Sequence, residues 1–335
     1  MTKRTKISCA TITPSGSWTL ILPQVLSFVK ATKVLQRIRR SLARRRNTIG
    51  QLYIANVPKI SHKVKVMEPL FRNFALVCKP ARPETASVAS QIQEILRKFG
   101  AQSRVYEGCP ESLTGHDIVV PIGGDGTFLR CVPTALASKL PLVGVNMGRL
   151  GYLVSISKDN LQENLSKVIH GEYTPTHRMV LKATLSNGEA RYALNELAIK
   201  SAEYRLASLK LSADNESITR YDCDGLILST PTGSTAYNLS AGGPLLHLKT
   251  DAIVVTPICA HSLTNRSLVF NSRSYLRVEP GDKPSRIHIN ADGHTIAEGD
   301  NCLPVQIRQA TRKLVILEDP ARASFDTLRE KLDWK

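Results

Sequence analysis

The chain has 335 residues, enough for about two domains, and its 42% hydrophobic and 22% charged residues are ordinary for a globular protein. Its formal net charge of +17 suggests a nucleic-acid partner, but 14 of its 45 basic residues lie within Met1–Met67, which contains no acid. The remaining chain, with 31 basic and 28 acidic residues, is nearly neutral, which argues against nucleic acid.

The first expected element is a basic amphipathic helix inside a leader of residues 1–67. Five apolar residues from Phe28 to Leu42 recur at spacings of three and four, and Lys and Arg residues repeat that spacing on the opposite face. This pattern in an acid-free N-terminus indicates a mitochondrial transit peptide and a location in the matrix. The alternative is a basic arm that binds a surface or is disordered. No apolar run reaches the ~20 residues of a membrane helix, so we expect no stable membrane insertion.

Residues 68–180 are expected to form a Rossmann-like α/β domain with a parallel sheet. Asn73–Pro80 is an apolar run that predicts a buried strand, and residues 83–100 carry the apolar stripe of a helix that ends at a glycine. This alternation of strand and helix is typical of βαβ units. Further strands are expected around Arg104–Tyr106, His116–Ile122 and Leu140–Asn146, with a helix after the second of these.

Residues 181–310 are expected to form a β-rich domain, because short strand-like runs follow one another with turn residues between them. The only helix suggested there lies near Thr235–Pro244. The last segment, 311–335, reads as one strand and one helix that could return to the α/β domain.

Three polar motifs interrupt this pattern. In PIGGDGTF (Pro121–Phe128), Asp125 places a carboxylate among three glycines directly after a strand, which suits either a plain turn or a loop that handles phosphate. Asn195 and Glu196 break a strand pattern. Asp224–Leu246 is dense in Ser, Thr and Gly, whose hydroxyls and backbone N–H groups suit ribose and phosphate.

Several other chemistries lack their sequence signals. The chain contains no G-x-S-x-G, no H-E-x-x-H, no Walker A motif and no G-x-G-x-x-G. Its seven cysteines are scattered without a C-x2-C pair, so we expect small apolar core residues in a reducing compartment rather than a disulfide framework or a zinc site.

With these motifs the chain resembles the NAD kinases from about Asn73 to its C-terminal region. The resemblance rests on GGDGT, GVNMGRLGYL, NE and DGLILSTPTGSTAYNLSAGGPLL, in the order and approximate spacing of the family. Lipid kinases of the diacylglycerol and sphingosine type share GGDGT, and they are the first alternative. A non-enzymatic nucleotide-binding module is the second. A lipid kinase would leave NE and STPTGSTAY without a purpose, and a binding module would need basic charge in the folded body, where there is almost none.

The resemblance implies an ATP-dependent kinase that phosphorylates the 2′-hydroxyl of the adenosine ribose of NAD or NADH, with Asp125 as catalytic base. It implies ATP as donor with Mg²⁺ or another divalent cation, no metal ligands from the protein, and a homo-oligomer, a dimer or tetramer. Mitochondrial fungal members prefer NADH. By position, residues 181–310 become the dinucleotide-binding domain, and the resemblance assigns binding to Gly123, Gly124, Gly126, Thr127, Asn195, Glu196, Asp224, Thr235, Ala236, Tyr237, Asn238, Ser240 and His294, the last replacing a frequent Gln.

Overall fold

The computed structural model describes residues 10–12, 18–20, 69–148, 151–282, 285–321 and 325–333. The chain divides into two units, Met1–Val66 and Met67–Lys335. In the first unit, β1 (Ala10–Ile12) pairs with β2 (Trp18–Leu20) in antiparallel fashion. The leader helix expected from Phe28 to Arg44 lies outside the described residues.

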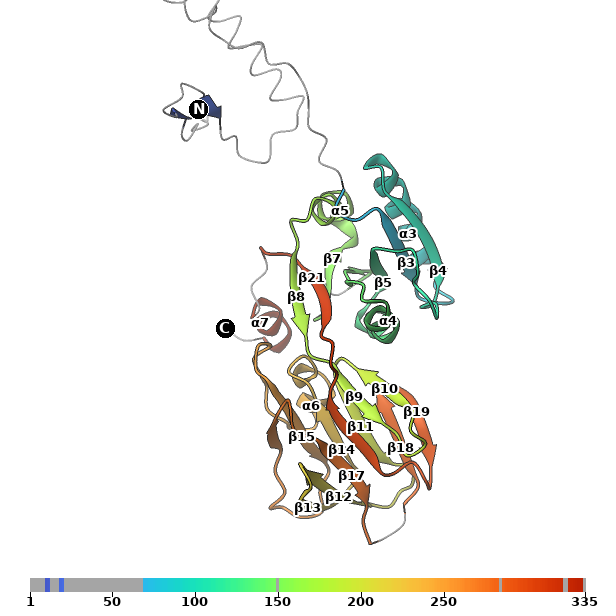
Figure 1. The fold of residues 1–335 in the computed structure, drawn as a ribbon, viewed down its shortest axis with the longest axis vertical. Coiled ribbons are helices and arrows are strands. Elements are labelled where there is room, and N and C mark those ends of the chain that lie inside the picture. The colour runs from blue at the N-terminus through green and yellow to red at the C-terminus, as the bar shows by residue number, and fades with distance from the viewer. Residues whose placement is uncertain are drawn as a thin grey trace, which may run out of the picture. The chain divides into compact units, whose positions relative to one another are not determined.

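A five-stranded parallel sheet forms the N-terminal half of the second unit (Figure 1), which confirms the expected fold class. Its order is β4-β3-β5-β6-β7. The central strands are buried along nearly their whole length, which explains their unbroken apolar sequences. The strands are β3 (Asn73–Cys78), β4 (Gln102–Glu107), β5 (Ile118–Gly123), β6 (Gly144–Asn146) and β7 (Val154–Ser157).

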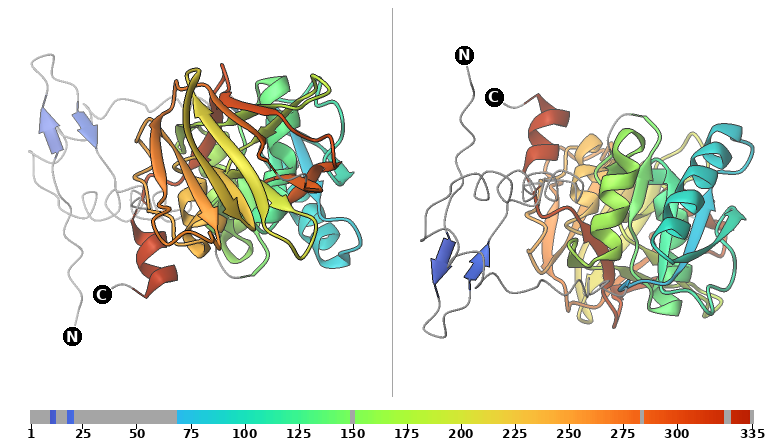
Figure 2. Two further views of the ribbon diagram at one scale, coloured as in Figure 1. Left: turned by 90° about the horizontal axis from the view of Figure 1, so that it is seen from below. Right: turned by 90° about the horizontal axis from the view of Figure 1, so that it is seen from above.

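Helices cover both faces of this sheet (Figure 2). On one face, α3 (Pro83–Lys98) and α5 (Leu161–Ile169) share an apolar cluster with the strands, and a single 3₁₀ turn, Lys158–Asn160, precedes α5. On the other face, α4 (Asp125–Ser138) packs through Phe128 and its neighbours. Helix α5 was not among the elements expected from the sequence, although its buried Leu161, Leu165 and Val168 have helical spacing.

The C-terminal segment returns to the parallel sheet. β21 (Leu314–Glu318) pairs antiparallel with β8 (Thr174–Arg178), and an ion pair between Arg178 and Glu318 links the two strands. On its other side, β21 exchanges backbone hydrogen bonds with Leu142: the Leu142 N–H donates to Val315 O at 3.0 Å, and the Leu317 N–H donates to Leu142 O at 2.9 Å. Helix α7 (Asp326–Leu332) follows.

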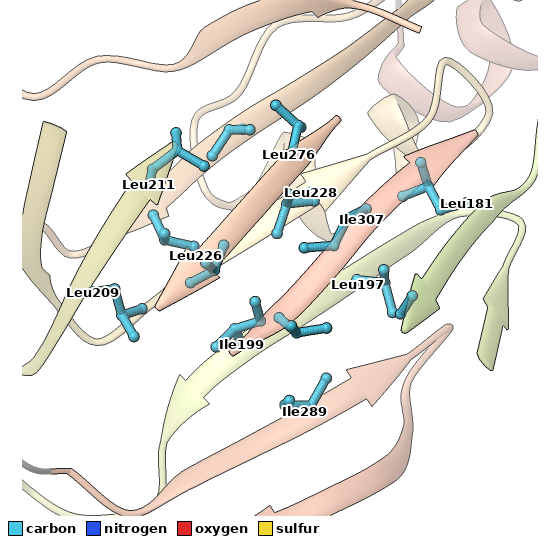
Figure 3. Close-up of a cluster of buried hydrophobic side chains, with 14 of the residues drawn as sticks. Leu181, Leu197, Ile199, Leu209, Leu211, Leu226, Leu228, Leu276, Ile289 and Ile307 are labelled. Atoms are coloured by element: carbon cyan, nitrogen blue, oxygen red, sulfur yellow. The ribbon is translucent and has the colours of Figure 1, made fainter. Parts of the chain in front are cut away.

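The rest of the second unit is an antiparallel β-sandwich. One six-stranded sheet has the order β10-β9-β20-β17-β12-β13, and the other has β16-β15-β14-β11-β18-β19. Leu and Ile side chains from both sheets meet between them (Figure 3). The strands are β9 (Leu181–Thr184), β10 (Ala190–Ala193), β11 (Glu196–Ser201), β12 (Ala207–Ala213), β13 (Glu216–Cys223), β14 (Gly225–Ser229), β15 (Ala252–Ile258), β16 (Leu268–Asn271), β17 (Leu276–Pro280), β18 (Ile287–Ala291), β19 (His294–Gly299) and β20 (Val305–Gln309).

Helical structure in the sandwich is short. A 3₁₀ turn (Gly233–Thr235) leads into α6 (Tyr237–Ser240), which occupies the segment where the sequence suggested a helix. Across the part of the chain that the structure describes, no helix has both the length and the apolar character needed to span a bilayer.

Candidate active site

A cavity of about 620 Å³ opens at the carboxyl ends of the parallel strands. Its walls come from the residues that follow β3, the turn after β5 and the end of β6, and His294 of β19 closes it from the sandwich. In the sheet, β4 lies on one side of β3 and β5 on the other, so the cavity lies where the strand order reverses. Ligands of open α/β sheets bind at this position.

The glycine turn brings the N-terminus of α4 to this cavity. Gly123 ends β5, Gly124 precedes the helix, and Asp125 is its first residue. A Cβ atom on Gly123 would lie 2.4 Å from Thr127 Oγ1, whereas a Cβ on Gly124 or Gly126 would meet nothing within 4 Å. The first glycine is therefore needed for packing, and the other two leave room for a ligand at the unpaired N–H groups of the helix.

The Asp125 carboxylate is fixed by the backbone of the segment that leads into β7. It accepts hydrogen bonds from the N–H groups of Tyr152 (2.9 Å) and Leu153 (3.1 Å). A Cβ atom on Gly151 would lie 2.0 Å from Asp125 Oδ1, so only glycine fits there. A carboxylate offers about four lone-pair sites, which leaves Asp125 able to accept a further proton or hydrogen bond.

Asp125 lines neither of two nearby cavities itself, but the residues around it line both. Its neighbours Gly124 and Gly126 line the large one. Its hydrogen-bond donors, Tyr152 and Leu153, line a second cavity of about 100 Å³ together with Thr235 of the Ser- and Thr-rich loop.

Positive charge dominates the large cavity. Lys79, Arg82, Arg130 and Lys158 line it, and Glu84 is the one acid among the described lining residues. Four cations around a helix N-terminus suit a polyphosphate.

Arg130 connects α4 to the sandwich. Its Nε donates a hydrogen bond to His294 Nε2 at 3.2 Å. Burial and the charge of Arg130 lower the pKa of His294, so the imidazole is neutral at pH 7 and accepts this bond.

Asn195 and Glu196 lie at the start of β11, where their backbone N–H groups bind the carboxylate of Asp292. Asp292 was not among the site residues expected from the sequence. Asp292 accepts hydrogen bonds from the N–H groups of Leu194 (2.8 Å), Asn195 (2.7 Å) and Glu196 (3.2 Å). Burial raises the pKa of Asp292 to about 6 and outweighs the lowering effect of these three bonds. The only sequence signal was the Asp-Gly pair at a β-turn, where Asp292 has φ 49°.

Glu196 is buried with one oxygen unused. Its carboxyl accepts from the Tyr237 N–H, while Oε2 has no hydrogen-bond partner among the described residues. Burial, and then the charge of Asp292, raise the pKa of Glu196 to about 8. The side chain is therefore mostly protonated at pH 7 and can donate a hydrogen bond to a ligand.

The Ser- and Thr-rich loop packs on the backbone of Asn195, so the structure joins the two predicted motifs. The Thr230 N–H donates to Asn195 O at 2.9 Å. A Cβ atom on Gly233 would lie 2.1 Å from the same oxygen, so that turn requires glycine. The side-chain amide of Asn195 is only half-buried, which leaves it accessible to a ligand.

The remaining predicted binding residues have varied settings. Ala236 and Tyr237 are half-buried and Ser240 is exposed. Asn238 is completely buried, and its side chain organises the loop: it donates to Pro244 O (3.0 Å) and Ser234 O (3.4 Å) and accepts from Thr256 Oγ1 (2.7 Å). Asp224 is exposed at the start of β14 and lines neither of these cavities.

Two family models match the chain. The ATP-NAD kinase N-terminal domain matches residues 101–173, and the ATP-NAD kinase C-terminal domain matches residues 194–318. The NAD kinase of Desulforamulus reducens is 36% identical over 275 residues, which cover 77% of this chain and 94% of that protein. The NAD kinase of Syntrophobacter fumaroxidans is 35% identical over 282 residues, or 78% of this chain and 99% of that protein.

Solved structures of similar fold include two kinases. Yeast NADH kinase complexed with NADH superposes with a TM-score of 0.69 at 24% identity, covering 80% of this chain and 88% of that one, and this likeness shows the fold. An NAD kinase from Archaeoglobus fulgidus in complex with ATP superposes with a TM-score of 0.66 at 25% identity, covering 78% and 98%.

The raised pKa of Glu196 predicts a stability that depends on pH. Its folded-state pKa of about 8 exceeds the usual value of 4.5, so the stability that the protonated side chain provides is complete below pH 4.5 and is lost as the pH rises through 8. Glutamine imitates the protonated acid. We therefore expect the free energy of unfolding of Glu196→Gln to match that of the wild type near pH 5 and to exceed it at pH 9 by an amount on the order of a few kcal/mol, with a correspondingly higher melting temperature.

The control is Glu203→Gln, which changes an exposed acid. Melting curves for both variants from pH 5 to 9 provide the comparison. A Glu196→Gln difference that stays constant with pH would contradict a protonated Glu196.

Proposed function

The chain belongs to the NAD kinase family, and we propose that Asp125 is the base of its reaction. The chain is an ATP-dependent NAD(H) kinase, and its similarity to NAD kinases extends over 94% of a relative's length, far beyond the turn shared with lipid kinases. The observation that carries the proposal is the position of Asp125, whose neighbouring residues line both the basic cavity and the cavity at Thr235.

We place the phosphates of ATP in the large cavity. The N–H groups at the start of α4 and the cations Lys79, Arg82, Arg130 and Lys158 supply donors and positive charge on several sides. Phosphoryl transfer depends mainly on positioning and on offsetting charge, which is what such a wall provides.

The dinucleotide takes the opposite side of Asp125. Asn195 offers an amide, protonated Glu196 a donor, and the loop up to Tyr237 a set of hydroxyls and backbone groups. Ribose hydroxyls and phosphate oxygens suit these groups. We propose that the 2′-hydroxyl lies next to the Asp125 carboxylate, on the side of the cavity that Tyr152, Leu153 and Thr235 line.

In the proposed reaction, Asp125 accepts the proton of the 2′-hydroxyl as the oxygen attacks the γ-phosphorus. General-base help of this kind contributes about 10²–10⁴ in rate. The described residues contain no cluster of three or more His, Cys, Asp or Glu side chains that could hold a metal ion. We therefore propose that the divalent cation arrives on the phosphates of ATP, where it would offset their charge.

Replacement of the base should separate chemistry from binding. We expect Asp125→Asn to lower kcat by about 10²-fold or more, because an amide cannot accept the ribose proton. Some loss of stability should accompany it, since the amide NH₂ would face a backbone N–H at residue 152 or 153. Initial rates with ATP and NAD, with Mg²⁺ and with EDTA, measure the effect and the need for the cation.

The matched control is Asp300→Asn, which changes an exposed carboxylate that lines neither the large cavity nor the cavity at Thr235, and it should leave kcat unchanged. Calorimetric binding of NAD to Asp125→Asn verifies that the site is intact. Turnover near that of the wild type would remove Asp125 from this role.

We also propose that the enzyme is a homo-oligomer joined through the sandwich. The loops that carry Tyr204 and Leu263 expose both side chains, at 112% and 88%. These loops flank Asp224, whose backbone hydrogen-bonds to Ser201 and Ile258 at their starts. A second copy seated here would cover the apolar side chains and bring Asp224 to the dinucleotide site of its partner.

The combined variant Tyr204→Glu/Leu263→Glu should therefore be a monomer in analytical ultracentrifugation, because two new charges cannot be buried at an interface. Its KM for NAD should rise if Asp224 serves the partner's site. Leu70→Glu changes an exposed leucine (65%) beside the parallel sheet and should leave the oligomer intact. An unchanged sedimentation coefficient in the double variant would exclude this interface.

For the leader we propose import into the mitochondrial matrix. The support is its acid-free, two-faced pattern of apolar and basic residues. The matrix holds NADH, so we further propose NADH as a good substrate alongside NAD.

Removal of residues 1–65 should leave kcat unchanged in vitro, because the first core strand begins at Asn73. In cells, the same deletion should move the protein from mitochondria to the cytosol. Microscopy of a fluorescent fusion measures this change of location. Substitution of Arg37, Arg40 and Arg44 by glutamate in the full chain should have the same effect on location as the deletion. A truncated protein still found in mitochondria would refute the targeting, and a kcat/KM strongly in favour of NAD would refute the choice of NADH.

A further inference from the structure

Two cysteines meet at the wall of the large cavity. Cys109 follows β4, is half-buried and lines the cavity beside Gly108. Cys131 lies on α4, six residues after Asp125, and is completely buried. Cys131 belongs to the apolar cluster beneath α4, and Cys109 packs against that cluster. The Cys109 thiol donates to Pro110 O at 3.8 Å and the Cys131 thiol to Thr127 O at 3.4 Å, and the two thiols lie close enough to interact with each other. The sequence alone did not predict this pair, because the two cysteines are distant in the chain and only the fold brings them together.

The two thiols differ in reactivity. Hydrogen bonds from Cys131 and Thr134 lower the pKa of the Cys109 thiol below its usual range despite partial burial. The same contact and full burial raise the pKa of Cys131. An accessible thiol of low pKa beside a protected one is the arrangement of an attacking cysteine and a resolving cysteine.

Among the other described cysteines, Cys78 also lines the cavity and Cys302 is buried elsewhere. Cys223 and Cys259 interact with each other, but neither lines this cavity. The Cys78 thiol donates to Thr85 O at 3.5 Å and the Cys223 thiol to Gly225 O at 3.1 Å, each within buried structure. Cys259 is exposed.

We propose that Cys109 and Cys131 form an oxidisable dithiol that a hydroperoxide converts to an intramolecular disulfide, and that this disulfide weakens binding of ATP. The site stands on the paired thiols and on the position of Cys109 in the cavity wall. The disulfide itself is independent of the proposed function, whereas its effect on ATP rests on it.

The chemistry balances with a hydroperoxide as the two-electron oxidant. The Cys109 thiolate attacks the peroxide oxygen, the O–O bond breaks, and a sulfenic acid forms with loss of water or an alcohol. Cys131 then attacks the sulfenic sulfur, the S–S bond forms, and the S–O bond breaks to release water. A dithiol reductant reverses the change through a mixed disulfide.

The disulfide would act on the cavity through distance. An S–S bond of ~2.05 Å is much shorter than the separation of two thiols in non-bonded contact, so the backbone at residue 109 must move towards α4. Gly108 and Cys109 line the cavity, and α4 carries the N–H groups that we assign to the phosphates. A shift between these two walls changes the geometry that holds ATP.

Peptide mapping tests the linkage without any assay of activity. The reduced full-length protein is treated with hydrogen peroxide, remaining thiols are alkylated, and the digest is analysed by mass spectrometry. We expect a Cys109–Cys131 peptide that a reductant removes. In Cys131→Ser, Cys109 should instead stop at a sulfenic acid that dimedone traps, whereas Cys78→Ser should form the wild-type linkage. Free Cys109 and Cys131 in wild type, under conditions that oxidise exposed Cys259, would overturn the proposal.

Kinetics test the consequence. The ratio of KM for ATP between the oxidised and reduced forms of each protein cancels any basal effect of a substitution. We expect a several-fold rise in wild type and in Cys78→Ser, reversed by the reductant, and no change in Cys131→Ser. If the linkage forms and KM for ATP does not move, the effect on ATP is overturned while the dithiol stands. An inactive reduced wild type would instead count against the proposed function.

Discussion

The carboxylate of Asp125 is the point at which separate parts of this molecule are joined. It sits at the first residue of α4, where the helix dipole favours an anion, and it accepts two N–H groups from the segment before β7. Gly151 lets that backbone approach so closely. The glycine turn, the two cavities and the entry to β7 therefore take their relative positions from one side chain.

Asp292 and Glu196 form an acidic pair in which burial disfavours the ionised form of the carboxyl group. Asp292 holds three backbone N–H groups at the start of β11, and Glu196 beside it stays largely protonated because burial and that neighbouring charge disfavour its ionised form. Two carboxyls in contrasting environments can serve as acceptor and donor in one site. Asp125 has the acceptor's surroundings and Glu196 the donor's.

Local sequence signals predicted much of this arrangement and missed what depends on distant contacts. The apolar runs of β3 and β5, the glycine turn and the many short strands of the sandwich follow from local pattern. Asp292 looked like an ordinary turn residue because its three donors lie almost a hundred residues away. Asn238 looked like a ligand contact, yet its amide is fully occupied by the loop around it. Cys109 and Cys131 looked like isolated core residues for the same reason.

The return of β21 to the parallel sheet has a consequence for how the chain acquires its structure. All strands of the sandwich lie between Leu142 and its partner, Ile316, in the sequence. During synthesis the first half therefore emerges with β8 unpaired, an exposed edge that can pair with the wrong chain until the last strand arrives. Pairing over such a separation also slows folding. The parallel-sheet half therefore completes its folding only after the sandwich and β21 have been synthesised.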